Sequence, residues 1–227
     1  MANPIKYSFS EEAWNRNKHI IDAIFEMPFI TELQSGKLSE ERFRHYIIQD
    51  AHYLKVYGRV LALASAKSAN SAHAQSFLAD SARCVNYEEA GLQQRLLDFG
   101  VDAHTFAKTE QSAACHHYTS FLMATGFNEG VEVLGAAVLP CYWIYREVGK
   151  WIAEKGAVDT NPYKAWIDMY SAKTFSDTTN LVIQRTDAMA ISADEKTSEA
   201  MHDAFKRAAQ LEFMFWDSAY KLEQWNI

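Results

Sequence analysis

Three polar side chains interrupt apolar helical faces, and their chemical types could act together. The first, Asp50, lies in a series whose steps of three and four residues keep one face of a helix. The other members of that series are Phe43, Tyr46, Tyr53 and Tyr57. A carboxyl group among aromatic rings needs a charged or hydrogen-bonded partner, or else a raised pKa.

The second is Cys141, which occupies the middle of another apolar series. That series comprises Leu134, Val138, Tyr145, Val148 and Ile152. Pro140 precedes the cysteine and cannot donate a hydrogen bond to the carbonyl of Ala136, so we expect a kink in this helix. A kink beside a thiol could open a small pocket.

The third is Glu212, which interrupts an apolar series in the last predicted helix. Its neighbours on that face are Phe205, Ala208, Phe215 and Ala219, with Trp216 alongside. Asp50, Cys141 and Glu212 are thus predicted on the inner faces of three different helices.

These groups suit chemistry on a small nitrogen heterocycle. A thiol can add to an electron-poor carbon, and a carboxylic acid with a raised pKa can donate a proton. A second carboxylate can accept hydrogen bonds from an amino group, while aromatic side chains enclose a flat ring. The sequence has no glycine-rich phosphate loop. The structural alternative stays open, because core cysteines, buried ion pairs and aromatic cores are common.

Composition excludes several classes of protein. The 227 residues are 48% apolar and 22% charged, with 9 Gly and 4 Pro, which excludes a disordered or collagen-like chain. The net charge of −7, without a Lys/Arg stripe, argues against nucleic acid as a partner. Three cysteines without short spacing argue against a disulfide framework and a structural zinc site.

The location of the protein is also predicted. Residues 1–7 lack an apolar signal core. The longest apolar stretch, Val133 to Tyr145, is too short to span a bilayer. Three reduced thiols suit a reducing compartment. We therefore expect a cytoplasmic protein with no membrane partner and with Cys84 and Cys115 in structural roles.

Helical periodicity extends along nearly the whole chain, and strand signals are sparse. We predict an all-α, single-domain helical bundle over residues 1–227. Ser8 and Glu11 form a capping box for a first helix that ends near Met27, and Ser192 and Glu195 form one for the last helix. Five other helices are predicted over 28–36, 39–68, 71–99, 113–127 and 130–156. A further helix is predicted to begin at Asn161 and another to end at Ile183, and the last helix is predicted to end near Trp225.

Three segments resemble motifs of the TenA/thiaminase II family. Residues 46–54, Tyr-Ile-Ile-Gln-Asp-Ala-His-Tyr-Leu, resemble its Tyr-x-x-Gln-Asp-x-x-Tyr-Leu motif. Residues 139–149, with the Pro140-Cys141 pair, resemble a second signature, and residues 212–216 resemble its C-terminal Glu-x-x-Phe-Trp. The resemblance covers almost the whole chain, and its middle motif is highly specific.

The resemblance implies a haem-oxygenase-like fold, a homotetramer and an aminopyrimidine aminohydrolase that needs no metal or organic cofactor. The implied substrate is aminomethyl-aminopyrimidine, a breakdown product of thiamin, or thiamin itself. Hydrolysis at the methylene carbon on C5 would release 4-amino-5-hydroxymethyl-2-methylpyrimidine, which re-enters thiamin synthesis.

The resemblance also implies roles for particular residues. Cys141 would be the nucleophile that adds to the pyrimidine ring, and Glu212 would be the general acid near a ring nitrogen. Asp50 would hold the amino group of the ring, and Tyr53 would tune the thiol. Substrate contacts are implied for Tyr118, Tyr145 and Tyr170. Because an apolar surrounding raises the pKa of a thiol, we expect proton transfer coupled to attack, with a carboxylate or Tyr53 nearby.

Other readings use different residues. A di-iron oxidase would need Glu-x-x-His spacing on two helices, and the chain offers Glu199 to His202, which we expect on a solvated face. A haem protein would need an axial ligand such as His19. A non-catalytic pyrimidine-binding or regulatory protein would use Asp50 and the aromatic residues without Cys141.

Overall fold

A computed structural model describes residues 8–87, 92–156 and 160–225. Within these ranges the chain forms twelve helices and no strand, which confirms the predicted all-α class. The helices are α1 (Phe9–Arg16), α2 (Lys18–Glu26), α3 (Pro28–Gln34), α4 (Glu40–Lys67), α5 (Ser71–Asn86), α6 (Gln93–Asp98), α7 (Ala103–Lys108), α8 (Ala113–Asn128), α9 (Val131–Glu154), α10 (Lys164–Ser171), α11 (Lys173–Ile191) and α12 (Glu195–Lys221).

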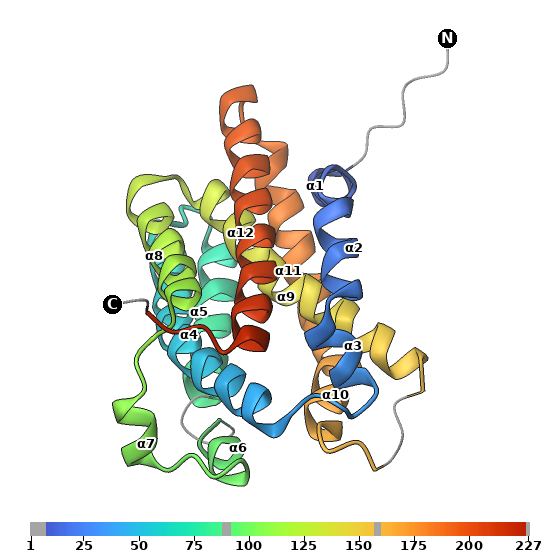
Figure 1. Ribbon diagram of the computed structural model, residues 1–227. Helices are drawn as coiled ribbons and strands as arrows, with labels where there is room; N and C mark the ends of the chain where they lie inside the picture. The colour runs from blue at the N-terminus through green and yellow to red at the C-terminus, as the bar shows by residue number, and fades with distance from the viewer. Residues whose placement is uncertain (1–7, 88–91, 157–159, 226–227) are drawn as a thin grey trace.

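Four long helices form the packing unit that positions the candidate site. Each of α4, α8, α9 and α12 contacts the other three, and the most extensive contacts join α12 to α9 and α4 to α5. The short helices α6 and α7 lie together at one end of the molecule, at the lower left of Figure 1. Asp50, Cys141 and Glu212 therefore belong to helices that pack directly on one another.

Side-chain caps explain where several helices begin. Ser8 and Glu11 form the predicted capping box at α1, and Ser39 accepts a hydrogen bond from the Arg42 amide at α4. The prediction of a second box at Ser192 is wrong, because Ser192 closes α11. Asp194 caps α12 instead, and its carboxylate accepts from the Thr197 amide over 2.7 Å.

The first predicted helix is two helices, separated at Asn17. This residue leaves helical geometry, with φ −111° and ψ 13°. Its side-chain amide donates to the carbonyl of Ala13 over 2.8 Å. Such a local bond gives the backbone an alternative to continuing the helix, which is why the apolar pattern alone missed the break.

Three further features of the helices differ from expectation. The single helix predicted over 71–99 consists of α5 and α6, and residues 88–91 of that prediction lie outside the described residues. Helix α7 was not predicted; Asp102 caps it by accepting from the Thr105 amide. Helix α11 also continues to Ile191, beyond the predicted end at Ile183.

Helix α9 carries the thiol and a close helix–helix contact. The helix continues through Pro140, and the Tyr57 hydroxyl donates to the carbonyl of Val138 over 2.8 Å. Gly149 follows Cys141 by about two helical turns. A Cβ added at Gly149 would lie 2.6 Å from the carbonyl carbon of Tyr170. The absence of a side chain at Gly149 therefore lets α10 approach α9 and fixes the position of Tyr170.

None of the helices in the described part of the chain is both long and apolar enough to cross a bilayer.

Candidate active site

A cavity of about 410 Å³ opens between α4, α5, α9, α10 and α11. Its aromatic walls are formed by Tyr57, Tyr87, Tyr142, Tyr145, Tyr170 and Phe175. The polar groups on its walls include Asp50, Asp80, Arg83, Cys84 and Cys141. A volume of this size, with apolar walls and few polar groups, suits a small organic molecule.

Asp50 presents a buried carboxyl group to this cavity. Its side chain belongs to a residue that is 5% exposed, and it makes no hydrogen bond with any described residue. Burial raises its pKa to about 7, although the positive charge of Arg95 opposes the shift. Near neutral pH, Asp50 can therefore either donate a proton or accept one from a bound ligand.

Cys141 lies on the α9 wall of the same cavity and is partly exposed. Burial raises the pKa of its thiol well above the ordinary value, and the negative charge of Glu212 adds to this effect. The Tyr53 hydroxyl acts in the opposite direction and lowers the thiol pKa. The thiol is thus protonated at rest, so that attack requires a group that takes its proton.

Glu212 lies behind the cavity wall rather than on it. It is 2% exposed, and its Oε1 accepts a hydrogen bond from the Tyr118 hydroxyl over 2.8 Å. Burial raises its pKa to about 8, while the hydrogen bond from Tyr118 opposes the rise. At neutral pH this arrangement holds a proton that a neighbouring base could accept.

Tyr53 and Tyr118 link Glu212 to the cavity through a row of neighbouring rings. The Tyr53 ring centroid lies 4.9 Å from that of Tyr118 and 5.3 Å from that of Tyr57, which lines the cavity. The Tyr53 hydroxyl is buried and, in the described part of the chain, forms no hydrogen bond of full geometry. It lies near enough to Cys141 to influence the pKa of the thiol.

Tyr145 and Tyr170 form an aromatic corner of the cavity. Their ring centroids are 4.9 Å apart. The Tyr145 hydroxyl accepts a long hydrogen bond of 3.4 Å from the Tyr46 hydroxyl, which itself accepts from the Trp166 indole over 3.1 Å. These bonds fix the position of the Tyr145 ring between α4 and α10.

The structure thus brings four of the seven predicted site residues to the cavity wall: Asp50, Cys141, Tyr145 and Tyr170. The other three, Tyr53, Tyr118 and Glu212, form a connected layer next to it. Whether a residue lines the cavity or lies in the layer beside it depends on the direction of its side chain, which helical spacing alone leaves open.

The expected structural role of Cys84 stays a prediction. Cys84 lines the cavity, and its thiol donates to the carbonyl of Leu54 over 3.3 Å. Cys115, in contrast, is buried, and its thiol donates to the carbonyl of Gln49 over 3.4 Å, as expected for a structural residue. The sequence around Cys84 lacks a distinctive motif, so only the packing of α5 on α4 could reveal its position.

Asp80 and Arg83 were also missed. They are three residues apart on α5 and form an ion pair at the cavity wall. In sequence, this spacing is typical of a solvent-exposed helical pair. The distinguishing feature is Arg185 on α11, whose buried guanidinium forms a second ion pair with Asp80.

The residues of the alternative readings are not assembled into a site. Glu199 forms an exposed ion pair with Arg16. His202 is buried against the Phe9 ring, 4.7 Å between centroids, so the expectation that it lies on a solvated face is wrong. His19 is exposed on α2. The described residues contain no group of three or more His, Cys, Asp or Glu side chains that could hold a metal ion.

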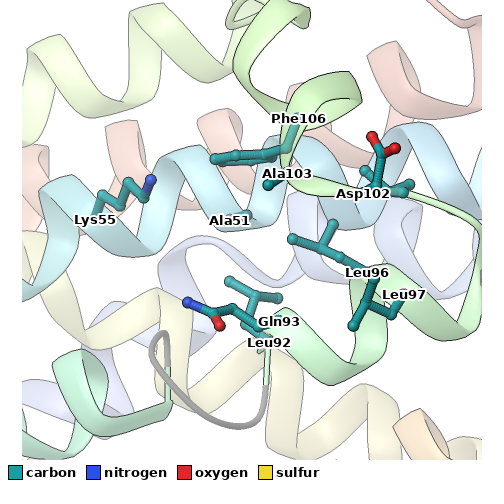
Figure 2. A pocket seen from close by; sticks show the side chains of 10 residues that line it. Ala51, Lys55, Leu92, Gln93, Leu96, Leu97, Asp102, Ala103 and Phe106 are labelled. Atoms are coloured by element: carbon teal, nitrogen blue, oxygen red, sulfur yellow. The ribbon is translucent and has the colours of Figure 1, made fainter.

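A smaller cavity of about 260 Å³ lies between α4, α6 and α7, and Figure 2 shows its side chains. Leu92, Leu96 and Phe106 contribute much of its apolar lining, and Lys55 lies at one side. It contains none of the predicted site residues, and it has few groups that could support chemistry.

The chain is similar to several thiamin-related proteins. It is 32% identical over 218 residues to "Thiamine biosynthesis multifunctional protein ThiED" of Corynebacterium efficiens, which covers 96% of this chain but only 29% of that protein. It is 29% identical over 220 residues to "Aminopyrimidine aminohydrolase" of Halalkalibacterium halodurans, which covers 96% of this chain and 98% of the relative.

Solved structures share the fold. A "TenA homologue protein from P. horikoshii OT3" superposes with a TM-score of 0.86 at 24% identity, covering 95% of this chain and 99% of the other. A domain of Shewanella denitrificans described as having a heme oxygenase-like fold gives a TM-score of 0.77 at 12% identity, covering 97% and 94%. These likenesses confirm the haem-oxygenase-like architecture.

The model of the TENA/THI-4/PQQC family matches residues 14–222. This match includes all four helices that carry Asp50, Tyr118, Cys141 and Glu212. The chain therefore belongs to the TENA/THI-4/PQQC family.

Proposed function

We propose that this protein is an aminopyrimidine aminohydrolase that releases 4-amino-5-hydroxymethyl-2-methylpyrimidine from aminomethyl-aminopyrimidine or from thiamin. The observation that carries the proposal is the shared cavity of Asp50 and Cys141, which is walled by tyrosine rings. The names of relatives such as the H. halodurans protein support the same substrate class.

In the proposed reaction, the Cys141 sulfur adds to a carbon of the pyrimidine ring and breaks its aromaticity. The bond between the C5 methylene and the leaving nitrogen then breaks, and the amine leaves with the electron pair and takes up the proton that the thiol releases. Water adds to the methylene carbon and loses a proton, after which the sulfur leaves, takes up that proton to restore the thiol, and aromaticity returns. The net change is exchange of the amine for a hydroxyl group.

The two carboxyl groups take different parts in this proposal. Glu212, whose pKa is about 8, is protonated at neutral pH and supplies a proton as electrons move onto the ring. Asp50, whose pKa is about 7, accepts hydrogen bonds from the amino group of the ring when ionised. Tyr145 and Tyr170 enclose the flat ring, and Tyr53 assists deprotonation of the thiol.

The catalytic residues and the expected cofactor independence belong to this proposal, as do the single-domain organisation and a homotetrameric, cytoplasmic state. Size-exclusion chromatography with light scattering tests the tetramer. A mass corresponding to the monomer at working concentration would contradict it.

Product formation tests the activity directly. Purified protein is incubated with aminomethyl-aminopyrimidine or thiamin, and hydroxymethylpyrimidine is measured by chromatography. We expect product from at least one substrate, and E212Q lowers kcat by about 100-fold or more, as for loss of a general acid. E199Q, which alters an exposed glutamate, is the control and retains activity. Absence of product from both substrates would contradict the proposal.

A further inference from the structure

The wall formed by α5 carries a positively charged cluster at the end of the cavity away from Asp50. Ser81 donates to the carbonyl of Gly58 over 2.8 Å, which places the Asp80 region beside Gly58 on α4. Eight residues separate Asp50 from Gly58, which is roughly 12 Å along a helix. The cavity is therefore longer than one pyrimidine ring, and its two ends have different chemistry.

The cluster consists of one carboxylate between two guanidinium groups. Asp80 is 2% exposed; its Oδ1 accepts from Arg83, and its Oδ2 accepts from Arg185 over 2.7 Å. Arg185 is itself fixed, because it donates to the Ser76 hydroxyl over 2.6 Å and lies 3.7 Å above the Phe77 ring. The three side chains carry one net positive charge.

Arg83 is the member that a ligand can reach. Its side chain is 54% exposed and lines the cavity, whereas that of Arg185 is 4% exposed. Apart from the bond to Asp80, its guanidinium forms no hydrogen bond with a described residue. Among the described cavity-lining residues the acids are Asp50 and Asp80, and Asp80 is already neutralised. Planar guanidinium groups bind carboxylates and phosphates through paired N–H donors.

We propose that Arg83, oriented by Asp80 and Arg185, is a specificity-determining residue that binds an anionic substituent on the leaving-group side of an aminopyrimidine substrate. The inference rests on the proposed function, because the ring is taken to lie against Asp50 and Cys141. A leaving amine that carries a carboxylate or phosphonate then extends toward Arg83. An uncharged leaving amine gains nothing there.

Matched ligands test this proposal. Three ligands keep the pyrimidine and its C5 methylene and differ in the leaving amine, which is glycine, aminomethylphosphonate or glycinamide bonded to the methylene through its nitrogen. The glycinamide compound has the shape of the glycine compound without its charge. Binding is measured by calorimetry in a C141S background, which avoids turnover. We expect the glycine compound to bind about tenfold more tightly than the glycinamide compound, as for one charge-assisted contact. Comparing the affinities of the glycine and aminomethylphosphonate compounds shows whether Arg83 prefers a carboxylate or a phosphonate.

Variants separate the contact from general charge effects. R83Q is expected to abolish the preference for the charged ligand, whereas R59Q, which removes an exposed arginine of α4, retains it. Equal binding of the glycine and glycinamide compounds to the C141S protein, or an unchanged preference in R83Q, would overturn the proposal. If the wild-type protein forms no product but the C141S protein still prefers the charged ligand, the hydrolase proposal is contradicted and the Arg83 contact stands.

Discussion

The hydroxyl of Tyr118 donates a hydrogen bond to Glu212 Oε1 over 2.8 Å and thereby joins α8 to α12 behind the cavity. This bond favours the ionised carboxylate, so it holds the pKa of Glu212 below the value that burial alone would produce. The proton affinity of the proposed general acid is thus set by a residue on another helix.

The variant Y118F tests this relationship. Loss of the hydrogen bond should raise the pKa of Glu212 above its value of about 8. Because the protonated acid is the active form, kcat/KM should fall at high pH, and in Y118F the fall should move to higher pH. Y220F, which removes an outlying hydroxyl bonded to Glu32, should leave the profile unchanged. A shift toward lower pH in Y118F would contradict the assignment.

The unpartnered carboxyl group of Asp50 should lower stability at alkaline pH. Its pKa is raised from 3.8 to about 7, so the folded state holds the proton more tightly than the unfolded state. Stability from this group is complete below pH about 4 and is lost as pH rises through about 7. D50N, which stays uncharged, should therefore exceed the wild type in unfolding free energy at pH 9 by about 2–4 kcal/mol.

Chemical denaturation of both proteins at pH 5 and pH 9 measures this difference. At pH 5 the Asp50 carboxyl is protonated in the folded protein, so the gap between the variants should shrink. If the wild type is more stable than D50N at pH 9, the description of Asp50 as a buried carboxyl group without a partner is contradicted.

Gly149 should control the position of Tyr170. An alanine there would place its Cβ 2.6 Å from backbone of α10, which cannot move as freely as a side-chain end. We expect G149A to lose about 1–3 kcal/mol of stability and to raise KM. In the control G130A, the added Cβ meets only the flexible carboxylate of Glu132. Equal losses in the two variants, measured by thermal unfolding and substrate titration, would contradict this role.

The sequence was informative wherever a polar residue broke a regular apolar face. Asp50 and Cys141 were found this way, and both line the cavity. Spacing could not reveal that Glu212 lies one layer deeper, since its direction depends on the packing of Tyr118 against Tyr53. Cys84 was missed because its position depends on how α5 packs against α4.

Local polar bonds account for the differences in helix boundaries. The Asn17 side chain breaks the first predicted helix by bonding to the carbonyl of Ala13. Asp194, rather than Ser192, caps the last helix because Ser192 already closes α11. Hydrophobic periodicity determines which helices exist, whereas single side-chain bonds decide where they begin and end.

The role of Cys141 is tested most directly by comparing turnover in C141S and C84S, because both thiols line the same cavity. Initial rates of hydroxymethylpyrimidine release are measured with substrate above KM, and circular dichroism verifies that each variant is folded. We expect C141S to lose about 1,000-fold or more in rate, as for removal of a covalent nucleophile, and C84S to keep a near wild-type rate. Near wild-type turnover in folded C141S would contradict the nucleophile assignment.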